Sequence, residues 1–427
     1  MSTSDIDIYA LYRVARYCDE LVDTGIRPGE KEPRFTCNVY LTKQADAYKV
    51  LKDLCTNFRS MLYWFDSQIV PVLDQAQEPV YNFSKANVVN GSFNYESTGS
   101  KTRANQIMVS WNNPANDYYV EGLLCEDREN IIRTGKAILE KAYAFGCTSE
   151  SQAKRYGRWK LWTGINQTEI ATFETALNAK FLVPGDIINI QDSDRNRIRY
   201  SGRISNTGTS VNTIPLDHSV TLKGAHTYGL SVLFVKSAAF LAQKTAEIHT
   251  TTAGNGSPES YVEGDLITHA WFYNNTSLTW ERLPIESENQ ATNARENTTT
   301  TEALLLSWAP HTRIETKEVT TSAGEVSSLT VSGGFSEAPD GESIWVLEEL
   351  DNDNIKTDSS AKEYKIMAIE EKEGGVFAIT AARHYNNKFD SIENENYRIS
   401  VESSPERALP REIQAPPPPS MALEYVD

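Results

Sequence analysis

The chain has 427 residues, 40% of them hydrophobic and 23% charged, a composition typical of globular proteins and far from that of disordered chains. A length about three times that of the commonest domain predicts two to four domains. The net charge of −17 argues against a protein whose main task is to hold nucleic acid, because such binding depends on Lys and Arg that neutralise phosphates.

The beginning of the chain, MSTSDID, has no basic segment followed by an apolar one, and no run approaches the roughly 18 apolar residues of a membrane span. We therefore expect synthesis in a cytoplasm and a water-soluble product. The odd number of cysteines, without a CxxC pair, predicts reduced core thiols and no metal site; they are Cys18, Cys37, Cys55, Cys125 and Cys147.

The N-terminal part predicts alternating helices and strands. Residues 4–24 begin with Ser4 and Asp7 in capping-box spacing. One face of this predicted helix carries Ile8, Leu11, Ala15, Cys18 and Val22. A turn-rich stretch at 25–33 precedes a half-buried strand at 35–41, a helix at 42–62 and a strand at 69–73. The first module is thus predicted to be a strand, helix, strand unit.

Short strands and turns dominate from about residue 106. Residues 107–111 predict a strand that ends at the turn signal Asn112, Asn113 and Pro114. Residues 148–162 predict a helix that Thr148 caps and in which Gly157 allows close packing. A turn and a strand follow at 183–190, and most of the remainder is rich in strand-forming residues. The sequence predicts a multi-domain α+β protein that turns to β barrels or sandwiches.

Two polar or proline-rich segments interrupt this pattern. Residues 286–301 contain no large apolar side chain and predict a mobile surface loop. Four consecutive prolines at 416–419 favour an extended polyproline II spacer, so the last domain should end near Leu409.

Local motifs give no catalytic, cofactor or metal site. The six histidines never occur as HxH, HExxH or HxxxH, and GxSxG, GxxxxGK[ST] and GxGxxG are absent. Residues 351–363 lack the central glycine of an EF-hand, and their terminal Glu363 is not at the twelfth position where an EF-hand needs it, so they predict a solvated hairpin loop. A glycan hydrolase would need two suitably spaced carboxylates, but in a chain with 58 acidic residues close pairs arise by chance; examples are Asp192, Asp194, Glu348 and Glu349.

Tryptophan faces can stack on sugars, although most of those in this chain lie in apolar or alternating patterns that favour core packing. These are Trp111, Trp159, Trp162, Trp308 and Trp345. Trp271 and Trp280 are different, because they lie in a segment that looks inserted. If that segment is an exposed β module, they are the possible surface-binding residues.

An ordered set of motifs then resembles the central part of phage tail tip attachment protein J of lambda-like siphophages. It runs through most of residues 8–400 and is weakest at about 236–311, the segment that looks inserted. The motifs are EPRFTCNVYL (32–41), VSWNNP (109–114), AFGCTSESQAKRYGR (144–158), VPGDII (183–188), SIWVL (343–347) and VFAITAARH (376–384).

This resemblance implies a baseplate-hub-like protein at the distal tail tip of a virion. Three copies would surround the axis, with β-rich tube or barrel domains that contact other tail-tip and tail-tube proteins and let genomic DNA pass without specific binding. Relatives in this family have a section before the first helix and fibre domains after the proline-rich junction. The resemblance therefore leaves three alternatives open for this chain: a split gene with the N-terminal hub half on a separate chain, a truncated chain, or a prophage remnant. It also implies that other domains or chains contact the host receptor.

The predicted domains are an α/β hub domain (1–105), a β-rich hub or tube domain (106–235), an inserted β module (236–312), a continuation of the hub domain (313–410) and a Pro-rich linker (411–427). The predicted function is structural, joining the tail tube to the distal fibre and forming part of the genome-delivery channel. Two alternatives stay open: a host-surface binding module, for glycan or receptor, in 236–312, and a tail-associated glycan hydrolase.

Overall fold

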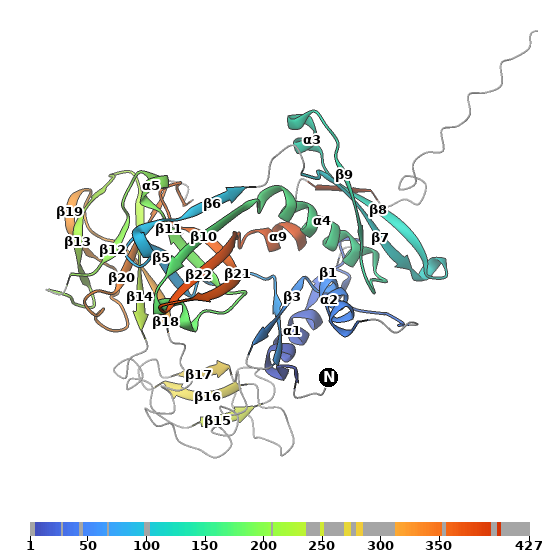
Figure 1. The fold of residues 1–427 in the computed structure, drawn as a ribbon, viewed down its shortest axis with the longest axis horizontal. Coiled ribbons are helices and arrows are strands. Elements are labelled where there is room, and N and C mark those ends of the chain that lie inside the picture. The colour runs from blue at the N-terminus through green and yellow to red at the C-terminus, as the bar shows by residue number, and fades with distance from the viewer. Residues whose placement is uncertain are drawn as a thin grey trace, which may run out of the picture.

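The computed structural model describes residues 5–26, 29–41, 46–65, 68–97, 103–205, 208–235, 248–251, 269–274, 279–284, 312–351, 356–393 and 399–402. It is β-rich, with several separate sheets and a few helices (Figure 1). Within these residues no helix is long and apolar enough to cross a membrane. The predicted loop at 286–301 and the prolines at 416–419 lie outside the described residues.

The central sheet has six strands in the order β5-β11-β21-β22-β10-β6. All neighbours are antiparallel except β5 and β11, which are parallel. The bounds are β5 Tyr81–Ser84, β6 Asn94–Ser97, β10 Glu169–Thr175, β11 Ile187–Gln191, β21 Lys362–Lys372 and β22 Val376–Arg383. This sheet therefore unites strands from three of the segments that the sequence predicted as domains; the division itself stays a prediction.

A second β layer packs on the central sheet (Figure 1). Its four strands lie in the order β12-β20-β14-β18, and β13 and β19 form a separate pair across a second core around Trp345. The bounds are β12 Ser201–Arg203, β13 Thr213–Leu222, β14 Thr227–Val235, β18 Thr312–Glu318, β19 Gly324–Thr330 and β20 Ile344–Leu350. Alternating apolar residues on these strands explain the two cores, since successive side chains point to opposite faces.

A third core lies where helix α4 (Glu150–Asn166) crosses a four-stranded sheet ordered β23-β8-β7-β9. The strands are β7 Gln106–Asn113, β8 Tyr119–Asp127, β9 Leu139–Tyr143 and β23 Ile399–Glu402. Gly157 allows the close packing that the sequence predicts, because a Cβ there would lie 2.4 Å from Cys125 Sγ. The cap of α4 is Ser149 and not Thr148, since the Ser149 side chain accepts from Gln152 N.

Short elements complete these layers. Asn113 caps the turn η4 (Pro114–Asn116), which confirms the predicted turn. Gly185 has a φ of +102° in the predicted turn before β11. The remaining bounds are η2 Val89–Gly91, α3 Arg128–Thr134, η5 Leu177–Phe181, α5 Ser193–Asn196 and α9 Lys388–Glu393.

The N-terminal part differs from the prediction. Helix α1 (Ile8–Asp19) begins four residues later than predicted, after Asp7, whose side chain accepts from Ala10 N and so takes the capping position predicted for Ser4. It ends five residues early, because β1 (Leu21–Asp23) and β2 (Lys31–Pro33) pair as a hairpin. Among the α1 side chains that the structure describes, Ala10 and Val14 are buried, whereas Leu11 and Ala15 of the predicted apolar face are exposed. The prediction is therefore wrong for Leu11 and Ala15.

The predicted strand at 35–41 and the long helix at 42–62 are also wrong. Only Phe35 is buried in the first segment, which forms no strand. Helix α2 (Ala47–Asn57) is followed by a hairpin of β3 (Ser60–Phe65) and β4 (Gln68–Leu73). The first module is thus a helix and an antiparallel hairpin, and not a strand, helix, strand unit. The turn to β3 occurs at Arg59, whose φ is +54°.

Candidate functional site

A group of buried charged side chains surrounds Asp74, directly after β4. The Asp74 carboxylate accepts hydrogen bonds from Trp159 Nε1 of α4 at 2.7 Å and from Lys388 Nζ of α9, and Lys365 Nζ of β21 lies 3.4 Å away. One carboxylate therefore joins the N-terminal hairpin, α4, α9 and the central sheet.

Burial and neighbouring positive charges shift the pKa of Asp74 in opposite directions. Burial alone would raise the pKa of Asp74, but the ammonium groups of Lys365 and Lys388 outweigh it and hold that pKa well below its usual range. Lys388 is fully buried and Lys365 nearly so. Burial lowers the pKa of both lysines, against the attraction of Asp74. The carboxylate is thus fully engaged by its neighbours.

Arg59 lies between α2 and β3 beside this group. Its backbone oxygen accepts from Asp74 N at 2.9 Å, and its side chain is only 3% exposed. Among the described residues none of its three guanidinium nitrogens has a hydrogen-bond partner, although the guanidinium carbon lies 5.0 Å from the Phe35 ring centroid. Burial lowers the pKa of Arg59 to about 10, so it stays a cation at neutral pH.

His384 follows β22 and is 1% exposed. Its Nε2 lies 3.0 Å from Asn386 Oδ1. Asn386 also bonds the backbone of Gln77 in both directions, accepting from its N at 3.1 Å and donating to its O at 3.0 Å. This fixes the amide orientation, so Nε2 is assigned as the donor and neutral His384 keeps a bare lone pair on Nδ1. Nδ1 has no partner in the described part of the chain.

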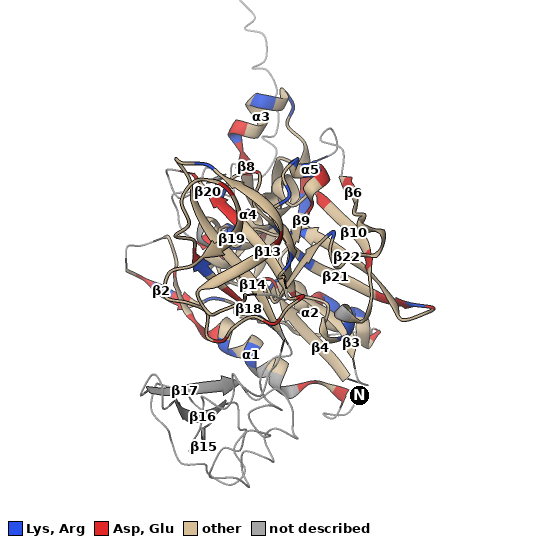
Figure 2. Cartoon of the chain, turned by 90° about the vertical axis from the view of Figure 1, so that its left-hand side faces the viewer, with Lys and Arg blue, Asp and Glu red and all other residues tan. Residues whose placement is uncertain are grey.

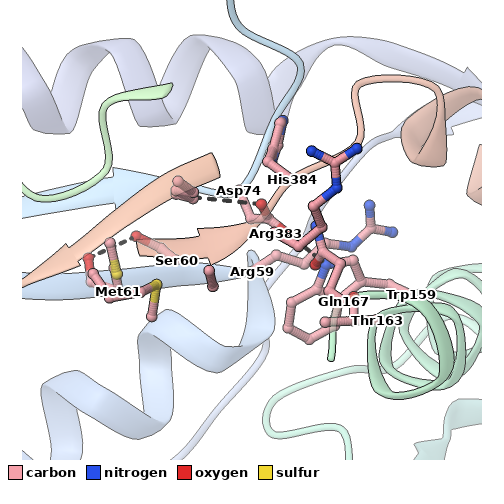
Figure 3. A pocket seen from close by; sticks show the side chains of 12 residues that line it. Arg59, Ser60, Met61, Asp74, Trp159, Thr163, Gln167, Arg383 and His384 are labelled. Atoms are coloured by element: carbon pink, nitrogen blue, oxygen red, sulfur yellow. Dashed lines mark hydrogen bonds and ion pairs between the residues drawn. The ribbon is translucent and has the colours of Figure 1, made fainter. Parts of the chain in front are cut away.

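These residues surround a cavity of about 290 Å³ (Figure 3). In that view Arg59, Asp74 and Trp159 lie near Arg383 and His384, which are consecutive residues at the end of β22. The lining consists of Arg59, Ser60, Met61, Asp74, Trp159, Thr163, Gln167, Lys365, Met367, Ala382, Arg383 and His384. The lining thus contains three basic residues, Arg59, Lys365 and Arg383, and one carboxylate. That carboxylate, Asp74, already has Trp159, Lys365 and Lys388 as partners.

The carboxylates singled out in the sequence each have their own partner. Asp192 caps α5, and Asp194 pairs with Lys85. Glu348 pairs with Lys356. Glu349 is fully buried with Lys223 at 2.7 Å, Thr357 at 3.0 Å and Tyr228 at 3.1 Å. Burial would raise the pKa of Glu349, but these hydrogen bonds and Lys223 lower it.

The other predicted residues separate into two groups. Trp111, Trp162 and Trp345 are buried, as predicted, and Trp159 is half-buried. Cys55, Cys125 and Cys147 are buried, whereas Cys18 is half-buried and Cys37 exposed, so the prediction of core thiols is wrong for Cys37. No group of three or more potential metal ligands occurs among the residues described. Trp308 lies outside them.

Trp271 and Trp280 lie on two paired strands of a small sheet. Its strands are β15 (Ile248–Thr251), β16 (His269–Asn274) and β17 (Thr279–Pro284). In the described part of the chain this sheet pairs with no other strand. The insertion therefore contains β structure, and the binding role of Trp271 and Trp280 stays a prediction.

Large apolar side chains are exposed at several separate places. Trp64 and Phe65 end β3, Tyr118 to Val120 form the tip between β7 and β8, and Ile132 of α3 is 82% exposed. In the view of Figure 2, acidic and basic residues are interspersed over the described elements. Exposed apolar side chains of this kind suit contacts between proteins.

Comparison with known proteins points to phage tails. A family described as putative phage tail protein matches residues 46–207. Tip attachment protein J of Escherichia phage SECphi27 is 35% identical over 204 residues, which are 47% of this chain and 17% of that protein. The protein of the same name from Escherichia phage SECphi4 is 34% identical over 187 residues, 44% of this chain and 16% of that protein.

The resemblance that the ordered motifs indicate is therefore confirmed, over a part of the chain that spans about a sixth of these relatives. A solved structure titled "Virion of native gene transfer agent (GTA) particle" is 15% identical and covers 37% of this chain and 36% of its own. Its TM-score of 0.30 is too low to support a structural argument.

Proposed function

We propose that this chain, part of which is similar to tip attachment protein J of two phages, is a structural component of a bacteriophage tail tip. The observation that carries the proposal is the 35% identity over 204 residues to a protein named Tip attachment protein J. Both relatives are named for attachment and not for catalysis. These names support the proposal of a structural role in the tail of the virion, without catalysis.

The finer proposal is a trimeric hub that joins the tail tube to the distal fibre and surrounds the path of the genome. Exposed apolar side chains on β3, on the β7–β8 tip and on α3 support it, because apolar surface at several places suits an assembly with more than one contact. The net charge of −17 supports passage of DNA without retention.

The test is the mass of the full chain in solution by light scattering, followed by imaging of the particles. A trimer would have three times the chain mass of 47.8 kDa. Trp64→Glu and Tyr119→Glu place charges on exposed apolar positions, and Lys372→Glu is the control at an exposed polar position. A trimer that either apolar-site variant disrupts and the control does not would support the hub. A monomer at all concentrations, with or without other tail proteins, would contradict it.

A host-surface binding module is the second candidate, and one observation favours it. Val235 at the end of β14 and Thr312 at the start of β18 are cross-strand partners. Residues 236–311 therefore leave and re-enter the fold at neighbouring positions, as an inserted module does. The strands that carry Trp271 and Trp280 lie within this insertion.

This geometry allows a clean deletion. Replacing residues 236–311 by a two-residue Asn-Gly turn should keep the β14–β18 pairing, since that turn suits antiparallel hairpins. The solution mass tests assembly, and adsorption of assembled virions to host cells tests binding. Lost adsorption with normal assembly would support the module, especially if Trp271→Ala with Trp280→Ala has the same effect. Unchanged adsorption would assign the insertion to another role.

A further inference from the structure

The tip between β7 and β8 is a protrusion that carries exposed aromatic side chains. Tyr118, Tyr119 and Val120 are each more than half exposed, and Tyr119 is 69% exposed. Asp117 and Tyr118 have φ values of +48° and +60°, in the left-handed region that residues other than glycine rarely adopt. Two consecutive residues of this kind indicate backbone strain, and strained residues cluster at sites that bind a partner.

Hydrogen bonds hold this tip in one conformation. Tyr118 N donates to Asn113 O at 2.8 Å, and Asn112 Nδ2 donates to Tyr118 O at 3.0 Å. The Glu121 carboxylate accepts from Asn113 Nδ2 at 2.9 Å and from Asn116 Nδ2 at 3.0 Å. Because the tip is already ordered, little conformational entropy is lost when a partner takes it up.

The same chain contains a cavity that suits such a protrusion. The surface that the cavity beside Asp74 offers is mostly apolar, and its volume of about 290 Å³ is at the lower end of small-molecule pockets. Among its lining residues Met61 and Trp159 are half-buried and Met367 is 47% exposed, so a neighbouring protein can reach them. Methionine is flexible, and its sulfur makes favourable contacts with aromatic rings. The accessible lining is therefore suited to an inserted tyrosine.

The charges of the two places are complementary. Residues 112–121 contain Asp117 and Glu121 and no Lys or Arg. The cavity lining contains three basic residues and one carboxylate, which already has cationic partners. Arg383 is the half-buried one of the three basic residues. An acidic tip is therefore attracted to this cavity, whereas most of an acidic chain repels it.

The tip and the cavity lie at different places on the molecule. In Figure 1 the end of β7 and the start of β8 project away from β3, β21 and β22, which contribute to the cavity. The tip therefore does not fill the cavity of its own chain. A protrusion and a complementary pocket at separate places on one molecule give a head-to-tail contact, which forms a ring when the rotation closes.

We propose that the β7–β8 tip of one copy inserts Tyr118 and Tyr119 into the cavity lined by Met61, Trp159 and Met367 of a second copy. Each copy then gives its tip to one neighbour and its cavity to the other. The inference rests on the proposed hub, because it names the contact between the copies of that hub.

Two variants of the full chain test the two sides of this contact. Tyr118→Ser with Tyr119→Ser removes the aromatic tip, and Met367→Glu places a like charge at the cavity. Each should raise the concentration at which half of the chains are associated about tenfold or more, as measured by light scattering, since buried aromatic anchors dominate interfaces. Ile132→Glu places the same charge on α3, at another exposed apolar position, and should leave association unchanged.

Mixing the two variants distinguishes a head-to-tail contact from a symmetric one. The tip variant keeps an intact cavity and the cavity variant keeps an intact tip, so equal amounts should form dimers where neither variant associates alone. If Met367→Glu does not fold, p-benzoylphenylalanine in place of Tyr119 gives the second readout. After illumination it should cross-link to Met61 or Met367 of another copy, as identified by mass spectrometry.

The possible failures are distinguishable. If the parent associates and the tip variant associates equally well, this contact is overturned while the proposed hub stands. Cross-links that fall outside the cavity, or no dimers in the mixture of folded variants, also overturn the contact alone. A parent that stays monomeric at all concentrations, with or without other tail proteins, overturns both the contact and the hub.

Discussion

Helix α4 offers two glycines on which the same substitution should have opposite effects. A Cβ at Gly157 would lie 2.4 Å from Cys125 Sγ and 2.9 Å from Val109 Cγ2, whereas nothing lies within 4 Å of one at Gly164. The first position faces a packed core and the second faces open space. Gly157→Ala and Gly164→Ala therefore separate core packing from helix propensity.

The magnitudes follow from these distances. Both changes favour the helix by about 1 kcal/mol, since alanine loses less backbone entropy than glycine. At Gly157 the new methyl must displace α4 from β7 and β8, and overpacking of this kind costs about 1–3 kcal/mol or more. We expect Gly157→Ala to lower the free energy of unfolding by about 2 kcal/mol and Gly164→Ala to raise it by about 1 kcal/mol.

Urea unfolding followed by tryptophan fluorescence measures the free energy of unfolding of both variants, because Trp111 and Trp162 belong to the core that α4 covers. Cys125→Ala in the Gly157→Ala background removes the closest atom and should recover part of the loss, a coupling of about 1 kcal/mol between touching residues. Equal stability of the two single variants, or no recovery in the double variant, would refute the assignment of Gly157 to close packing.

Three further changes test the buried polar groups. Asp74→Asn leaves two buried ammonium groups without their anion and should cost about 3–5 kcal/mol, whereas the exposed Glu174→Gln should barely move the urea midpoint. Burial lowers the pKa of His384 in the folded chain from 6.5 to about 4. The neutral imidazole therefore contributes its full share to the free energy of unfolding above pH 6.5, and up to about 3 kcal/mol of that free energy is lost as pH drops toward 4. His384→Gln should flatten this decline in stability, and an unchanged pH profile would contradict the assignment. Asn105 is buried and its Oδ1 accepts from Ile138 N at 2.7 Å, so Asn105→Ala should cost about 1–3 kcal/mol in thermal unfolding, and a neutral result would count against it.

Elements with strong local signals could be predicted from the sequence. β7 and its Asn-Asn-Pro turn combine alternation with a turn signal, and β11 follows a glycine that adopts a positive φ. At Gly185 a Cβ would also lie 2.2 Å from Val72 Cγ1. In these places local propensity and tertiary packing favour the same structure.

The N-terminal errors have a different cause. Helix α2 ends at a non-glycine residue with positive φ, Arg59, and no local signal marks that turn. The apolar residues after it continue a helical spacing, although Ser60–Phe65 pairs with Gln68–Leu73 as a hairpin. Pairing between strands decided the structure there, and periodicity within one strand could not reveal its partner.

The cavity was beyond prediction for a related reason. Arg59 and Asp74 come from the N-terminal hairpin, Trp159 from α4, and Lys365 and His384 from the end of the described chain. Sequence separation of about 300 residues between Asp74 and its lysine partners hides their contact from any local motif. The net charge of −17 gives no sign of this cluster either, because a sum over the whole chain is dominated by its many acidic residues. The antiparallel pairing of β21 with β11, and of β22 with β21, brings Lys365 of β21 and Lys388 of the following helix α9 to Asp74, so the fold creates a local charge opposite to that of the whole chain.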